Sequence, residues 1–385
     1  MAWVLGVSML RVGLIPPEQC PPVTVALVEA AIEGAGDWAV DNLRSDGRFL
    51  YRHDRVADPL LASPISLGYN LPRHAGMTNA LYQAVVSGFD HYLPGADVSL
   101  NYMLDNLVEH DDWVAFASQD RPVKIGSTGL FVASLVHRRI ATGDTIHDDL
   151  IQAGARFLAS QQEPNGALLA FWDRGSSSPV PDTYGAFGTG EAMWALALAG
   201  QVFPDDGFTE AARRTGAYIA SDRRENEGLI LRIPDHWAAY AFDALGGPET
   251  EIEREYLRRM AGDFALMTRV ESTRSASGLQ AQLRWGHALG AGVGALGEGL
   301  GGLERLSRID TTLGVDADAL AEHLACAGGI LVDRQVTEEE AGAYAHPMMV
   351  RGAWFKNEAT QVDDQQHTLS ALLALRDVLT LAGGG

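Results

Sequence analysis

The chain has 385 residues, of which 46% are hydrophobic and 21% are charged. This is the composition of a soluble globular protein with a large core. The sequence contains no run of 18 apolar residues, so no membrane span is predicted. The formal net charge of −21 argues against nucleic acid or an anionic membrane surface as a partner.

Residues 1–22 are expected to form an N-terminal extension. The first 15 residues are fairly apolar, but they lack the basic start and the small-residue cleavage site of a secretion signal. We therefore expect a cytoplasmic protein, with secretion as the alternative. Cys20 and Cys326 are too few for a disulfide framework or a metal cluster. Both are expected to be ordinary thiols that are buried or half-buried.

From residue 23 onward, two helix patterns alternate six times. The first pattern has apolar residues at helical spacing mixed with charge, as in a half-exposed helix, and it covers residues 23–43, 94–108, 146–162, 207–222, 249–271 and 315–328. The second pattern has small apolar residues nearly all round, as in a buried helix, and it covers residues 73–90, 123–142, 186–201, 235–246, 282–300 and 363–382. The alternation predicts an all-α domain over residues 23–385, with six inner helices inside six outer ones.

The connections between these helices are long at one end only. From an inner helix to the next outer one the chain needs a few residues, whereas residues 44–72, 163–185 and 329–362 lead from an outer helix to an inner one. Loops this long in a compact domain are usually functional. Because all of them fall where the inner helices begin, we expect the functional site at that face.

Charged and polar side chains cluster in the first turns of the inner helices. These positions hold Arg73 and His74, Lys124, Glu191, Asp235 and His236, Arg284 and His287, and Asp363 with Asp364. Six helix N-termini that point inward also favour an anionic ligand or a developing negative charge. Each acid also has a structural interpretation, because Asp and Glu complement the dipole of any helix start.

The last inner helix carries the strongest candidate. Asp363, Gln366 and His367 are spaced i, i+3 and i+4, so they share one helix face. An Asp and a His on one face of a buried helix are suited to proton transfer. The alternative is a purely structural hydrogen bond between them.

Several known motifs are absent from the sequence. There is no HExxH, no P-loop and no nucleotide fingerprint after a strand, and the glycine cluster from Gly290 to Gly294 is expected to permit close helix contact. We expect no cofactor and no metal, and the sequence does not predict the oligomeric state.

The six-hairpin layout, with polar residues at the inner-helix starts, resembles the (α/α)6-toroid superfamily of six-hairpin glycosidases, polysaccharide lyases and sugar epimerases. The segments that carry this resemblance are Tyr69 to Gly76, Gly188 to Ala192, Asp235 to Trp237 and Asp363 to Leu373. The resemblance implies a sugar-binding funnel with acid/base roles for Glu191, Asp235 and Asp363.

A second resemblance is to triterpene cyclases. The run from Gly154 to Gly166 looks like one copy of their Gln/Trp repeat, with Leu168 where an aromatic residue is expected. The run Gln361-Val-Asp-Asp364 is similar to their Asp-x-Asp-Asp acid except at its first residue. This resemblance implies that Asp363 protonates a terpene substrate.

We therefore expect a carbohydrate-active enzyme, foremost a glycoside hydrolase, or else a uronate epimerase or lyase. Asp363 is the expected general acid, Glu191 or Asp235 the second carboxylate, and His367 a further catalytic group. The expected substrate-binding residues are Tyr69, Asn70, Arg73, His74, His236, Trp237, Arg284, Trp354 and Gln366. The substrate is a small molecule or oligosaccharide that could be anionic; the alternatives are a terpene cyclase and a non-catalytic glycan- or peptide-binding toroid.

Overall fold

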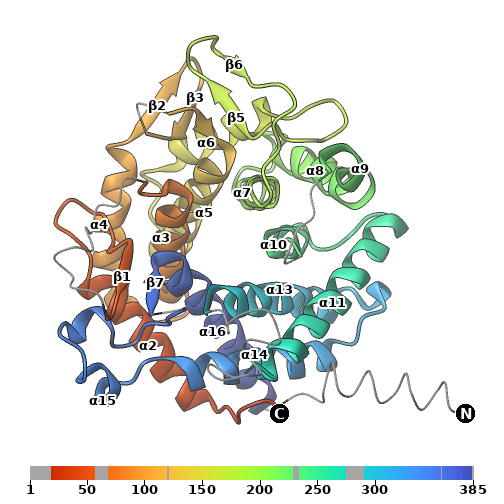
Figure 1. Ribbon diagram of the computed structural model, residues 1–385. Helices are drawn as coiled ribbons and strands as arrows, with labels where there is room; N and C mark the ends of the chain where they lie inside the picture. The colour runs from red at the N-terminus through yellow and green to blue at the C-terminus, as the bar shows by residue number, and fades with distance from the viewer. Residues whose placement is uncertain are drawn as a thin grey trace, which may run out of the picture.

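The protein is an (α/α)6 toroid, as the helix patterns predict. The computed structural model describes residues 19–56, 68–118, 121–228, 234–274, 290–356 and 358–383. Within these residues the chain forms two concentric rings of helices (Figure 1). None of the helices in this part of the chain combines the length and apolar character that crossing a bilayer requires.

The inner ring consists of the small-residue helices. Each contacts the next, and the last packs against the first, so that the ring closes. In ring order these helices are α3 (Leu71–Val86), α5 (Ile125–Thr142), α7 (Gly188–Val202), α10 (His236–Ala244), α13 (Gly290–Ile309) and α16 (Val362–Gly383).

The outer ring consists of the mixed-character helices. These are α2 (Val25–Asp41), α4 (Leu93–Leu104), α6 (Asp148–Ser160), α8 (Phe208–Ser221), α11 (Glu251–Ser272) and α14 (Ala317–Arg334). The shorter helical elements are α9 (Arg223–Glu227), α15 (Glu338–Ala341) and the single turns η1 (Asp90–Tyr92), η2 (Thr311–Leu313) and η3 (Pro347–Met349).

Glycine lets the inner helices approach one another closely. A Cβ atom built on Gly294 of α13 would lie 2.5 Å from the backbone carbonyl carbon of His367 on α16. A Cβ on Gly129 of α5 would lie 2.9 Å from the backbone oxygen of Glu191 on α7. Both separations are too short for a real Cβ, so these glycines set the helix spacing at the level where the candidate site residues lie.

The long loops contain short strands that the sequence analysis did not predict. They form three antiparallel sheets. The strands are β1 (Arg52–Asp54) with β7 (Ala359–Gln361), β2 (Leu107–His110) with β3 (Trp113–Phe116), and β4 (Val123–Lys124) with β5 (Phe171–Asp173) and β6 (Ser178–Pro179). Of these sheets, β1–β7 and β4–β5–β6 join two loops, and β2–β3 is a hairpin within one loop.

The ring is closed where the first hairpin meets the last. Strand β1 pairs with β7 there, with Arg52 opposite Gln361, and the two strands lie side by side in Figure 1. On the outer side, the Gln335 amide nitrogen donates to the Ala31 carbonyl at 2.8 Å, and the Trp38 indole nitrogen donates to the Met349 carbonyl at 2.9 Å. These contacts join segments about 300 residues apart in the sequence.

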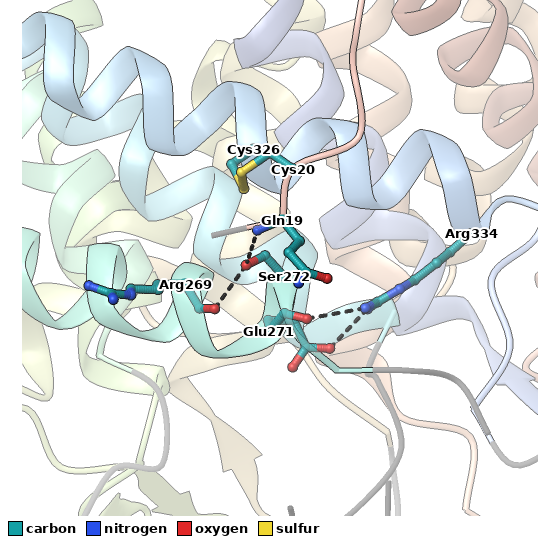
Figure 2. Close-up of a disulfide and its surroundings, with 7 residues drawn as sticks. All are labelled: Gln19, Cys20, Arg269, Glu271, Ser272, Cys326 and Arg334. Carbon is teal, nitrogen blue, oxygen red and sulfur yellow. Dashed lines mark hydrogen bonds and ion pairs between the residues drawn. A yellow bond between two sulfur atoms is a disulfide. The ribbon is translucent and has the colours of Figure 1, made fainter. Parts of the chain in front are cut away.

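The prediction of two ordinary thiols is wrong, because Cys20 and Cys326 form a disulfide. Cys326 lies on α14, and the bond ties to it the segment that leads into α2 (Figure 2). The Gln19 backbone N–H also donates to the Ser272 hydroxyl at the end of α11, 3.2 Å away. The sequence could not predict this bond, since a separation of 306 residues brings the cysteines together only after the ring has closed.

Replacing both Cys20 and Cys326 by Ser is expected to lower the free energy of unfolding by about 2–5 kcal/mol, because a disulfide restricts the unfolded chain. Urea unfolding followed by circular dichroism measures the effect. Dithiothreitol is expected to shift the wild-type midpoint in the same direction and to leave the double variant unchanged. Equal midpoints for the two proteins would contradict the prediction.

Candidate functional site

A cavity of about 550 Å³ lies where the inner helices begin. All six inner helices contribute to its lining, together with the loops that precede α7. The predicted convergence of the helix starts is therefore observed. Of the predicted site residues, the cavity is lined by Asn70, Arg73, Glu191, His236, Trp237, Asp363 and His367.

Tyr69 and His74 do not line this cavity. His74 is fully buried, with Nδ1 2.7 Å from the Tyr69 hydroxyl and Nε2 3.1 Å from the Ser99 carbonyl oxygen. Burial lowers the pKa of His74 to about 3, so its ring is neutral. Tyr69 also accepts a hydrogen bond from the Phe49 backbone N–H at 3.1 Å. The pair holds the loop before α3 in place.

Three further predicted residues lie behind the cavity wall. Asp235 is buried in an ion pair with Arg223, whose Nη1 lies 2.7 Å from its Oδ2. The Trp354 indole nitrogen donates to the Leu331 carbonyl at 2.8 Å, within the core. Gln366 is buried, and its amide nitrogen donates to Glu298 Oε1 at 3.3 Å. Arg284 lies outside the described residues.

Glu191 lies in the first turn of α7, where its half-buried side chain lines the cavity. Burial raises the pKa of Glu191 to about 8, and the neighbouring Asp235 carboxylate contributes to the rise. Its side chain fits because Gly126 on α5 has no Cβ, since a Cβ there would overlap Glu191 Oε2. At neutral pH this residue is therefore a carboxylic acid that can donate a proton.

Glu298 is the important residue that sequence reasoning missed. It lies on α13, fully buried, between α10 and α16. Its Oε2 is 2.6 Å from His367 Nδ1 and 3.4 Å from His236 Nε2. The signal was present, because Glu298 is the one charged residue in the glycine-rich run from Gly290 to Gly302.

The two histidines carry different charges. Burial by itself would lower the pKa of His367. The Glu298 carboxylate acts in the opposite direction, and together with Asp363 and Glu191 it outweighs burial and raises this pKa to about 9. Burial, reinforced by the positive charge on His367, brings the pKa of His236 well below its usual range. His367 is thus an imidazolium and His236 a neutral imidazole, and their ring centroids are 5.0 Å apart.

Asp363 faces Glu191 across the cavity, because α7 and α16 occupy opposite positions in the ring of six. The Asp363 Oδ1 lies 3.4 Å from Arg73 Nε and 3.6 Å from His367 Nε2. Arg73 is held in turn by the Tyr51 hydroxyl at 2.8 Å and by Gln361 Oε1 at 2.6 Å. Asp363 is therefore an anion between two cations, whereas Glu191 is a neutral acid.

His236, Glu298 and His367 have the ligand types of a metal site, with candidate ligand atoms within 4.8 Å of one another. However, the 2.6 Å separation between His367 Nδ1 and Glu298 Oε2 is that of a charge-assisted hydrogen bond. Metal binding requires that this proton be lost. The same three side chains can therefore act as an imidazole, a carboxylate and an imidazolium when no metal is bound.

The similarity of this chain to known proteins lies in the fold alone. No family model matches the chain, and no curated protein matches its sequence. A cellobiose 2-epimerase from Spirochaeta thermophila superposes with a TM-score of 0.66 at 13% identity, over 93% of this chain and 97% of that one. An inactive α-1,6-mannanase from Salegentibacter in complex with α-1,6-mannotetrose has a TM-score of 0.62 at 12% identity, over 91% and 99%.

A type II terpene cyclase from Scytonema has the same fold, with a TM-score of 0.56 at 13% identity over 92% of this chain and 98% of that one. These superpositions establish the toroid fold for this chain, but sequence identities of 12–13% do not establish a reaction.

Glu191→Gln is expected to stabilise the protein between pH 5 and 8. In the unfolded chain this acid ionises near 4.5, the usual pKa of a glutamate, while the folded one keeps its proton to about 8, so wild-type stability falls as pH rises through this window. Each unit of pKa difference corresponds to about 1.4 kcal/mol, so a gain of about 1–4 kcal/mol is expected at pH 8. Urea unfolding of both proteins from pH 4 to 9 measures the difference, and a gain independent of pH would contradict the prediction.

Proposed function

We propose that the protein is a carbohydrate-active enzyme that catalyses proton transfer in the cavity at the start of the inner helices. A volume of about 550 Å³ falls within the range of small-ligand sites. Its lining combines the aromatic faces of Phe187 and Trp237 with hydrogen-bonding and ionisable groups. The similarity in fold to an epimerase and a mannanase adds support for a sugar substrate.

One observation carries the reaction class that we favour. A neutral imidazole, His236, and an imidazolium, His367, line one cavity and both lie next to the same buried carboxylate, Glu298. A neutral imidazole can remove a proton from carbon, and an imidazolium can return one. This arrangement suits epimerisation or isomerisation of a sugar at the carbon next to its carbonyl group.

The proposed reaction begins with the open-chain form of a reducing sugar. His236 removes the proton from the carbon next to the carbonyl, while the acid of Glu191 donates a hydrogen bond to the carbonyl oxygen, on which negative charge develops. His367 then protonates the same carbon from the opposite face, which gives the epimer. In an isomerisation His367 protonates the former carbonyl carbon instead, while Glu191 gives its proton to the oxygen of that carbon and takes one from the hydroxyl group of the carbon that lost its hydrogen. After the first transfer both imidazoles are protonated beside the Glu298 carboxylate, and the transfer from His367 returns the pair to a single positive charge, now on His236.

A second candidate, glycoside hydrolysis, is supported by the two carboxyl groups on opposite helices. Glu191 rather than Asp363 suits the role of general acid, because Glu191 is the protonated member of the pair. Asp363 would then activate water or act as the nucleophile. We no longer propose Asp235 for the second carboxylate, because Arg223 neutralises it behind the wall.

Terpene cyclisation by Asp363 has less support. Aromatic walls around a single acid suit a cyclase, but this cavity is lined by Arg73, Lys124, Glu191, His236, Asp363 and His367. A non-catalytic glycan-binding toroid stays a separate proposal, distinguished by variants that keep binding but lose turnover.

We also propose that the protein folds in an oxidising compartment. The Cys20–Cys326 disulfide supports this over the cytoplasm, where thiols are kept reduced. The division into an extension over residues 1–22 and one domain over 23–385 is retained as a proposal.

His236→Asn and His367→Asn are each expected to lower turnover by about 10²–10⁴-fold, the usual contribution of an acid or base. Cellobiose and α-1,6-mannobiose are incubated in D2O and followed by NMR. Epimerisation places deuterium next to the carbonyl carbon, whereas hydrolysis produces new reducing ends. His91→Asn, an exposed histidine outside the cavity, is the control.

In that assay Asp363→Asn distinguishes the two reaction classes. For epimerisation we expect a loss of about tenfold, because Asp363 only positions Arg73 and His367. Hydrolysis through Asp363 predicts a loss of at least about 10²-fold with little effect of His236→Asn. The second pattern would overturn the histidine mechanism while leaving a sugar-acting enzyme.

Dialysis against EDTA is expected to leave turnover within about twofold of the untreated enzyme, because in the proposed reaction His367 donates its proton while hydrogen-bonded to Glu298 and no step uses a metal. Metal content is measured before and after by mass spectrometry. Loss of activity that Zn²⁺ or Mn²⁺ restores would contradict the proton-transfer assignment.

A further inference from the structure

A second, smaller cavity of about 260 Å³ adjoins the candidate site. The two cavities share Asn70, Pro72 and Lys124, so they meet at the starts of α3 and α5. The smaller one extends outward between the loop that leads into α3 and the loop that leads into α5. A ligand longer than one sugar unit can therefore occupy both.

The charge of this smaller cavity is opposite to that of the chain. Lys124 and Arg121 both line it, and its described lining contains no Asp or Glu. This occurs in a protein with a net charge of −21 and only two lysines. Two exposed cations, with no acid among the described residues that line the pocket, point to a negatively charged ligand.

Lys124 is held at the boundary between the two cavities. It is the N-cap residue of α5, and its Nζ lies 5.7 Å from the centre of the Phe171 ring on β5. Strand β4, which ends at Lys124, pairs with β5 and fixes the start of the side chain. Its ammonium group can therefore reach a ligand in either cavity.

The rest of the smaller cavity is suited to a sugar ring. Tyr69 and Tyr102 line it, with ring centroids 5.9 Å apart and nearly perpendicular planes. Tyr69 is fixed by its hydrogen bonds to His74 and Phe49. Burial raises the pKa of Tyr102, so its hydroxyl keeps its proton and adds no negative charge. An aromatic face beside hydrogen-bonding groups suits a ring with one apolar side.

We propose that the smaller cavity binds an anionic sugar unit, through Arg121 and Lys124, next to the unit that reacts in the main cavity. The shared chemistry of this unit is a carboxylate, sulfate or phosphate group on a sugar ring. The inference rests on the proposed function, because it assumes that the main cavity binds the neighbouring sugar.

Calorimetry with matched disaccharides tests this proposal. Cellobiose is the neutral probe, and cellobiouronic acid, cellobiose sulfate and cellobiose phosphate carry one anionic group on the non-reducing unit. We expect at least one anionic probe to bind the wild type about tenfold or more tightly than cellobiose, the effect of one charge-assisted contact. The rank among the three identifies the anionic group.

Arg121→Gln, Lys124→Gln and the double variant are compared with Lys356→Gln. Lys356 is the other lysine and is exposed outside both cavities, so its replacement changes the net charge equally. The ratio of the affinity for the anionic probe to the affinity for cellobiose is expected to fall about threefold or more in each single variant. This ratio is expected to return to about one in the double variant and to stay unchanged in Lys356→Gln. Cellobiose affinity is expected to change little in Arg121→Gln.

Equal binding of neutral and anionic probes by the wild type would overturn the proposal, as would a preference that the double variant keeps. Neither result bears on turnover, so the proposed function can survive the loss of the anionic subsite. Conversely, a charge preference without turnover of any probe would support the subsite and contradict the enzyme.

Discussion

Closure of the ring is the constraint on which the rest of the structure depends. The candidate site has no single element of its own, because each of the six inner helices contributes to its lining. The helix starts meet only if the last hairpin returns to the first. Pairing of β1 with β7 contributes to this return at the site face, and the Gln335 and Trp38 hydrogen bonds contribute on the outer side. Gln361 on β7 also holds Arg73 on α3, so one contact of the closure positions a cavity residue directly.

Within the closed ring, burial decides the chemistry. Glu298 lies beneath the cavity with no exposed surface, yet its carboxylate sets the charge of two histidines from the neighbouring helices. Burial of Glu191 has the opposite outcome, because burial and the neighbouring Asp235 raise its pKa more than His367 and Lys124 lower it, so the acid keeps its proton. Asp363 forms ion pairs with Arg73 and His367. Three carboxyl groups of similar intrinsic acidity thus acquire different roles from their surroundings.

The sequence predicted the fold well because helix periodicity is a local property. Eleven of the twelve ring helices begin within two residues of their expected starts, whereas α13, expected over residues 282–300, is described over Gly290–Ile309. Glu191, His236 and Asp363 converge as their places in the first turns implied, and His367 joins them from the helix face that it shares with Asp363. What it missed depends on contacts between distant segments. Asp235 looks the same in sequence as a cavity acid, and only the approach of Arg223 removes it from the site. Glu298 lies two turns inside its helix, where helix position alone predicts packing. The strands and the disulfide exist only because the loops and the two ends of the ring meet.

The disulfide gives the molecule a property that no single hairpin has. Because it joins residue 20 to residue 326, that stretch of backbone forms a covalent loop that runs through most of the toroid. A protease that cuts any one peptide bond within this loop, including the long connections over residues 44–72 and 163–185, leaves both fragments attached to each other. The packed rings can then hold a nicked chain in register, so one cut in such a loop need not separate the two fragments.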